Sequence, residues 1–362
     1  MTQAISTKTG KIPQFAYVRI LACFGVVLLH TLFASSLALE PSGSAPFSAQ
    51  AWQNNLMWGV PCFLMTTGAL LLNPEKNISL HKIYTKYVKR IAITLVVFTL
   101  IFATLDPLMD GSKFSFSSVA GNWIRNVVTD GSWAHMWYLY LLIGIYAMLP
   151  VYRAIMRSCS DREIQYICAI FVLFVSVFPM TELFDFKIGF YLCTTIIYPM
   201  YPILGYAIFN GKIKFSRLTS AIILIGCTVS IVLLTYFRIN YADLCFDADK
   251  LGIFDELFGY ASIFVIGQGV SIYSLICSMK IEAGLSGKKE KFIFAIDKCT
   301  FGAYLIHMIF LKYTLLCKHF NPLNYAGAQM TGVVLLMAIC FFVGSLAITW
   351  VLRKIPGIKS FL

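Results

Sequence analysis

Arg19 and His30 lie eleven residues apart in a long apolar stretch near the start of the chain, where ionisable side chains are costly. At 100° per residue, eleven residues make three helical turns plus about 20°, so both side chains share one helix face, about 16 Å apart along the axis. A neutral buried histidine can act as a general base, and an arginine can contact an anion. The alternative is that Arg19 reaches the lipid headgroups and His30 bonds a neighbouring helix.

Two more histidines lie in apolar stretches. His307 falls near the middle of residues 295–317, where it could take part in catalysis or form a bond between helices. His135 opens residues 134–152 beside Trp137 and Tyr138, and such aromatic residues are typical of a membrane-interface belt. We therefore expect His135, Trp137 and Tyr138 to contact a substrate or line its entrance rather than to catalyse.

A basic cluster at 82–90 contains Lys86, Lys89 and Arg90. Cytoplasmic loops of membrane proteins are rich in such residues, so topology alone could explain it. The alternative is a cradle for a phosphorylated cytoplasmic donor, because these side chains pair with phosphate oxygens. The chain has no nucleotide-binding loop, no H-E-x-x-H metal pair and no G-x-S-x-G elbow. An ATP-driven pump, a serine hydrolase and a metal site are therefore disfavoured.

The elements that would position these side chains follow from composition. Hydrophobic residues make up 59% of the 362 and charged residues 13%, whereas a soluble domain carries about 25% charged residues. The apolar residues form continuous runs near the ~20 that span a bilayer as helix, without the alternation of a membrane β-barrel. We expect an all-α polytopic membrane protein, a single domain over residues 1–362, with about ten transmembrane helices. The predicted spans are 14–38, 53–72, 89–108, 134–152, 164–181, 189–209, 218–237, 258–279, 295–317 and 331–352.

The positive charge is unevenly distributed between the alternate connections. Of the 29 Lys and Arg residues, 22 fall on the side that holds both termini, and an excess of these residues marks the cytoplasmic side. We therefore expect both termini in the cytoplasm. The net charge of +12 then indicates contact with anionic phospholipids rather than nucleic acid, because no soluble basic domain is present.

Several motifs in sequence order resemble the acyltransferase-3 family of integral membrane acyltransferases. The family has Arg, ten residues and His in its first span, a "VPxFFxxSG" pattern in its second, "HLWFL" at the start of its fourth and "GxYLxH" in its ninth. The matching segments here are Arg19 to His30, 60–68 with Thr67 in place of Ser, 135–139, and 302–307. The fourth span also ends in a proline followed by Arg153, as family members do. Within this family, the order of motifs and spans most resembles the enterobacterial common antigen O-acetyltransferase type.

This resemblance implies transfer of an acyl group, usually acetyl from cytoplasmic acetyl-CoA, to a hydroxyl of a cell-envelope glycan or its lipid-linked precursor, in the bacterial plasma membrane. His30 would be the base or an acyl carrier, with Arg19 and His307 also catalytic. Thr67 and Tyr304 are candidates for stabilising the oxyanion. The resemblance assigns the CoA headgroup to a set of basic side chains: Arg19, Lys86, Lys89, Arg90 and Arg153. It is compatible with a homo-oligomer.

The chain departs from the family pattern beside Arg19. Ala16 stands where members usually carry an acidic residue, and Ile20 where many carry Gly. What orients His30 is therefore left open. A transporter or exporter of a small solute or glycan intermediate is the alternative function, although no paired interrupted half-helices are visible.

Overall fold

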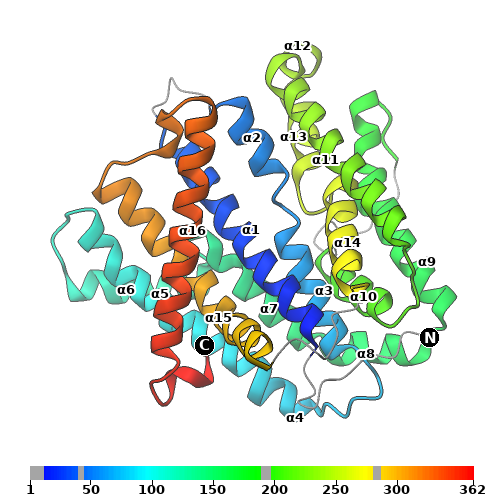
Figure 1. The fold of residues 1–362 in the computed structure, drawn as a ribbon, viewed down its shortest axis with the longest axis horizontal. Helices are drawn as coiled ribbons and strands as arrows, with labels where there is room; N and C mark the ends of the chain where they lie inside the picture. The colour runs from blue at the N-terminus through cyan, green and yellow to red at the C-terminus, as the bar shows by residue number, and fades with distance from the viewer. Residues whose placement is uncertain (1–11, 40–44, 189–196, 280–286) are drawn as a thin grey trace.

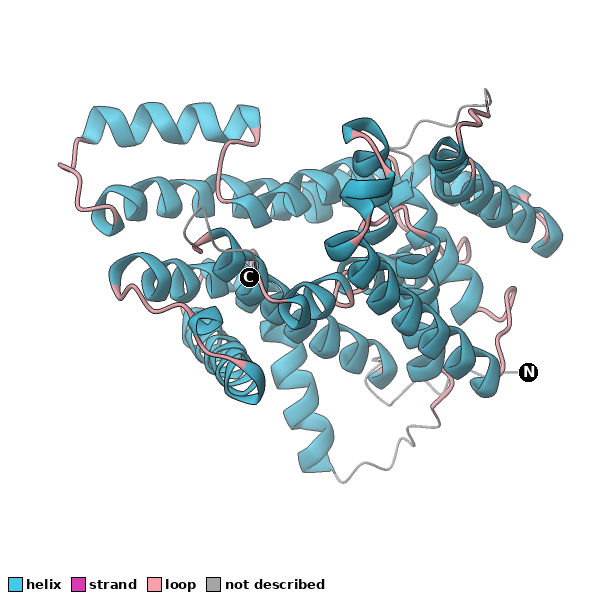
Figure 2. Cartoon of the chain, turned by 90° about the horizontal axis from the view of Figure 1, so that it is seen from above, coloured by secondary structure: helices cyan, strands magenta, loops and turns pink. Residues whose placement is uncertain are grey.

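The computed structural model describes residues 12–39, 45–188, 197–279 and 287–362, and every regular element in these ranges is a helix. Helix α1 (Pro13–Leu37) runs through the middle of the molecule (Figure 1) and packs against α3, α15 and α16. Figure 2 shows the same all-helical arrangement from above. The other α-helices of eight or more residues are α2 (Phe47–Asn54), α3 (Gly59–Leu71), α5 (Lys89–Met109), α6 (Phe116–Thr129), α7 (Trp137–Ala147), α8 (Leu149–Ser158), α9 (Asp161–Val172), α10 (Ile197–Phe209), α11 (Arg217–Asn240), α13 (Ala248–Asp255), α14 (Ile263–Cys277), α15 (Gly287–Lys312) and α16 (Gly327–Leu352).

The structure confirms an all-helical membrane protein but not the predicted count of about ten spans. Among the described residues, seven helices are long and apolar enough to cross a membrane, and an eighth crossing results if α7 and α8 form one span. These two are bent by 50°, at Met148. Pro150 is the second residue of α8, and a proline cannot continue the hydrogen-bond ladder of the helix before it.

The second and sixth predicted spans account for the difference. The apolar run 53–72 divides into the end of α2, a turn and the 13-residue α3, and 13 residues rise only about 20 Å. Helix α10 also has 13 described residues, and the first part of that predicted span, 189–196, lies outside the described residues. For the second predicted span, mean hydropathy has the same value whether an apolar run forms one long helix or a turn and a short helix, so the sequence pattern could not distinguish the two.

Helix α3 and the described part of α10 cross with their backbones in direct contact. A Cβ atom added at Gly68 would overlap the carbonyl group of Pro202, and one added at Gly205 would overlap that of Met65. Small residues at such crossings let membrane helices approach closely and gain van der Waals contact. The two glycines thus hold α3, which lies against α1, in a fixed position.

We expect Gly68→Ala to destabilise the protein by at least the ~1–3 kcal/mol typical of overpacking, because the clash is with backbone. The measurement is the melting temperature in detergent, followed by size-exclusion chromatography. Gly226→Ala in α11 is the matched control, since no atom lies within 4 Å of the Cβ added there. Equal melting temperatures for the two variants would contradict the close crossing.

Candidate active site

His30 of α1 and His307 of α15 meet inside the bundle. The Nδ1 atom of His30 lies 2.8 Å from Nε2 of His307, and the two rings stack with centroids 5.0 Å apart and planes 7° from parallel. His307 is 1% exposed, and His30 is partly buried. The structure therefore joins two residues that the sequence analysis named separately.

The hydrogen bonds assign the protons on this histidine pair. Nδ1 of His307 lies 2.6 Å from the carbonyl oxygen of Tyr304, which can only accept, so this nitrogen carries a hydrogen. In the neutral ring, Nε2 of His307 then has a lone pair and accepts from Nδ1–H of His30. The remaining nitrogen of neutral His30, Nε2, has a free lone pair. His307 thus fixes His30 in the tautomer that leaves Nε2 available as a base or nucleophile.

His135 is the third member of this cluster. Its ring centroid lies 6.3 Å from that of His30 and 5.5 Å from that of His307. Nε2 of His135 lies 3.2 Å from the carbonyl oxygen of Leu305, to which it donates, while its Nδ1 is buried without a hydrogen-bond partner in the described structure. In the part of the chain that is described, no group of three or more His, Cys, Asp or Glu side chains could hold a metal ion.

The tyrosine and threonine hydroxyls proposed for the oxyanion are already engaged. The Tyr304 hydroxyl donates to the backbone carbonyl of His135, and the Thr67 hydroxyl donates to the Phe63 carbonyl at 3.0 Å. Neither O–H is free to stabilise a developing negative charge in this arrangement. Tyr304 instead ties the helical turn just before α7 to α15, which holds His135 beside the histidine pair.

The predicted aromatic contacts divide between two places. The Tyr138 ring lies 5.5 Å from that of Tyr304, next to the histidines. The Trp137 ring packs on the rings of Tyr198 and Tyr260, each 5.6 Å away. Tyr138 therefore borders the histidine cluster, whereas Trp137 belongs to an adjoining aromatic group.

Arg19 is paired with a carboxylate that the sequence analysis did not consider. Its Nε and Nη2 atoms donate to the two carboxylate oxygens of Asp297 on α15, at 2.6 and 2.7 Å. Asp297 is the acidic residue at the start of the apolar run 295–317, which was the available signal. The carboxylate absent at Ala16 is thus supplied from another helix.

These two pairs show that α1 and α15 run in the same direction. Asp297 and His307 are ten residues apart, Arg19 and His30 eleven, and each pair meets in sequence order. Between them, the Cys23 thiol lies 3.3 Å from the Thr300 carbonyl oxygen. The first and ninth predicted spans should indeed cross the membrane in the same sense.

We expect Arg19→Ala and Asp297→Ala each to lower the melting temperature, because each leaves a largely buried charge without its partner. The double variant should lose less than the sum of the two single losses, with a coupling of about 0.5–3 kcal/mol in a double-mutant cycle. Strict additivity would show that the ion pair contributes nothing to the folded state.

The predicted CoA-contacting residues lie in different environments. Lys86 and Lys89 are exposed. Arg90 donates to the Leu362 carbonyl oxygen at 3.0 Å, and its guanidinium lies 5.3 Å from the centre of the Phe301 ring. Only the two lysines are therefore free of the packing that occupies Arg19 and Arg90.

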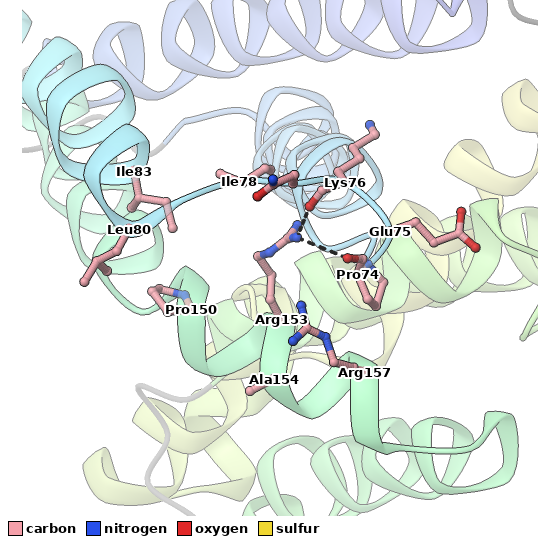
Figure 3. Close-up of a pocket in the computed structure, with 11 residues that line it drawn as sticks. Pro74, Glu75, Lys76, Ile78, Leu80, Ile83, Pro150, Arg153, Ala154 and Arg157 are labelled. Carbon is pink, nitrogen blue, oxygen red and sulfur yellow. Dashed lines mark hydrogen bonds between the residues drawn. The ribbon is translucent and has the colours of Figure 1, made fainter.

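Arg153 is buried, with 6% of its surface exposed. Its two terminal nitrogens donate to backbone carbonyls at the end of α3 and in the segment that follows it, as Figure 3 shows in part. The four accepting residues are Leu71, Asn73, Pro74 and Lys76. A guanidinium has five N–H groups, so this one has little capacity left for a phosphate and mainly holds the segment in place.

A charged cluster that the sequence analysis missed borders His135. Asp106 accepts from the Trp133 indole at 2.8 Å and from Lys312 at 3.1 Å. The Lys312 ammonium lies 4.2 Å from the centre of the Trp133 ring, and the Phe102 ring stacks on the same indole with centroids 4.1 Å apart. Two ionisable residues at the ends of apolar runs were the signal, because such residues rarely lie there unpaired.

These observations define a class of protein: a multi-pass helical bundle with a histidine pair held between two parallel helices. The chain belongs to the acyltransferase-3 family: the family model, described as an acyltransferase domain, matches residues 12–354. It is thus a membrane acyltransferase by family. No curated protein and no solved structure matches the chain.

Proposed function

We propose that this membrane acyltransferase moves an acyl group, in the first instance acetyl, from cytoplasmic acyl-CoA to a hydroxyl of a cell-envelope glycan or its lipid-linked precursor. The observation that carries the proposal is the free Nε2 lone pair of His30, held in place by His307. The resemblance of the sequence motifs to the enterobacterial common antigen O-acetyltransferase type supports an O-acetyl product. The excess of Lys and Arg on the side that holds both termini supports a bacterial plasma membrane with the donor in the cytoplasm.

In the direct route, His30 Nε2 takes the proton of the acceptor hydroxyl while the hydroxyl oxygen attacks the thioester carbonyl. The C–S bond breaks, an ester forms, and the CoA thiolate takes the proton back from His30 to leave as the thiol. In the covalent route, the same lone pair attacks the thioester carbonyl, the C–S bond breaks, and the CoA thiolate leaves with the Nδ1 proton of the acylated ring. The acceptor hydroxyl then attacks the acyl carbon, the N–C bond breaks, and the hydroxyl proton returns to His30. Both routes start from the same lone pair.

His307 assists either route by sharing the charge of protonated His30. A cation inside an apolar bundle is unfavourable unless it is paired or dispersed. The Nδ1–H of His30 points at the Nε2 lone pair of His307, so a proton gained at one ring can be shared with the next. Tyr304, through its carbonyl, holds the far end of this chain of hydrogen bonds.

The test uses purified protein in nanodiscs with radiolabelled acetyl-CoA and measures both binding and the slow release of free CoA thiol. The wild type should bind and release thiol, whereas His30→Ala should bind without release. Radiolabel that stays on the wild-type protein after acid quenching would select the covalent route. Protein that neither binds nor cleaves acetyl-CoA would overturn the proposal in favour of a transporter.

A further inference from the structure

A pocket of about 410 Å³ lies between the segment that follows α3 and helix α8, at the end of the bundle that the charge count assigns to the cytoplasm. Arg153 holds its wall through four backbone carbonyls, and Figure 3 shows Arg157 one helical turn further along α8, on the same side. The size falls within the ~300–1,000 Å³ of small-molecule sites. The hydrogen bonds of Arg153 thus preform the pocket, and the Arg157 guanidinium takes no part in them.

The charges around this pocket are unbalanced. Arg157 makes no hydrogen bond or ion pair with any described residue, and its neighbour is the Arg153 guanidinium. Burial and the charge of Arg153 lower the pKa of Lys76 in the facing segment. The acid that lines the pocket, Glu75, points away from both arginines in Figure 3. Two adjacent cations without a counter-ion favour a bound anion, which relieves their repulsion.

Beside its charged residues and the polar Asn77, the pocket has an apolar part. The apolar side chains that line the pocket beside its two arginines are those of Ile78, Leu80, Ile83 and Pro150. An inorganic phosphate would leave this apolar surface unused, whereas a group with a phosphate attached to a ring would contact both parts. The pocket therefore matches a phosphorylated nucleoside better than a free anion.

We propose that this pocket binds the phosphorylated adenosine end of the acyl-CoA donor, with Arg157 as the side chain that contacts its phosphate. The proposal rests on the proposed function, because it takes acyl-CoA as the donor. It moves the donor contact from Arg153, whose donors are occupied, to a residue that sequence patterns did not single out. An anionic phospholipid headgroup presents the same phosphate chemistry and is the competing occupant.

The experiment measures the affinity of acetyl-CoA and of adenosine 3′,5′-bisphosphate, which lacks the thioester arm, in nanodiscs of phosphatidylcholine alone. Arg157→Gln should weaken both affinities about tenfold or more, as expected for loss of a charge-assisted hydrogen bond. Arg157→Lys should recover part of the lost affinity, because lysine keeps the positive charge at this position. Arg162→Gln, an exposed arginine in the next helix, is the matched control.

Two outcomes would overturn the proposal. If Arg157→Gln leaves both affinities unchanged while His30→Ala still abolishes thiol release, the pocket does not hold the donor and the proposed function stands. If Arg157→Gln instead removes phosphatidylglycerol that copurifies with the wild type, with acetyl-CoA affinity unchanged, the occupant is a lipid headgroup. Absence of thiol release by the wild type would separately refute the proposed function.

Discussion

His30→Ala should lower the rate of acyl transfer by about 10²–10⁴-fold, the usual contribution of a general acid–base group. The variant removes the lone pair to which the proton assignment points, while the Arg19–Asp297 pair still holds α1 against α15. The measurement is release of CoA thiol at saturating acetyl-CoA, normalised to folded protein. Added imidazole should restore part of the activity, because it can occupy the vacated space.

His81→Ala is the matched control for this prediction. His81 is exposed in the connection between α3 and α5, so the same chemical change there should leave the rate unaltered. A His30→Ala protein that folds, binds acetyl-CoA and transfers at the wild-type rate would show that the base is another group.

His307→Ala should lower kcat about tenfold to a hundredfold with little change in the KM for acetyl-CoA, because it removes the partner that fixes and shares the charge of His30. His307→Gln should recover part of the loss, since an amide can accept from His30 Nδ1–H and donate to the Tyr304 carbonyl. The measurement is a comparison of kcat and KM for the three proteins.

The glutamine variant separates positioning from packing. If the alanine and glutamine variants lose activity equally, the hydrogen bond between the two histidines is not what matters. If both lose it through KM, His307 acts on donor binding and the charge-sharing role is wrong.

The sequence allowed the two histidines among the three catalytic candidates to be named but not joined. His30 and His307 stood out because ionisable residues in apolar runs are rare, yet their contact spans 277 positions of sequence and depends on how α1 and α15 pack. For the same reason the partner of Arg19 was missed: Asp297 is 278 positions away. Residue type and spacing along one helix carry no information about which helix lies opposite.

Arg153 illustrates a second limit. A basic residue after a span was expected to reach phosphate, but the segment that leaves α3 places four carbonyl oxygens around its guanidinium. Loop geometry decides which cation stays free, and loops have no periodicity to read. The apolar runs, by contrast, predicted the helical class correctly, but at 53–72 they could not show the turn that shortens α3.

The double attachment of α1 to α15 has a mechanical consequence. The ion pair at Arg19 and the histidine pair at His30 are about 16 Å apart along the helix, and sliding by even one residue would break both. The two helices therefore behave as one rigid body. Any movement that admits a donor from one side and an acceptor from the other must come from the surrounding helices, among which the bent pair α7–α8 is the natural hinge.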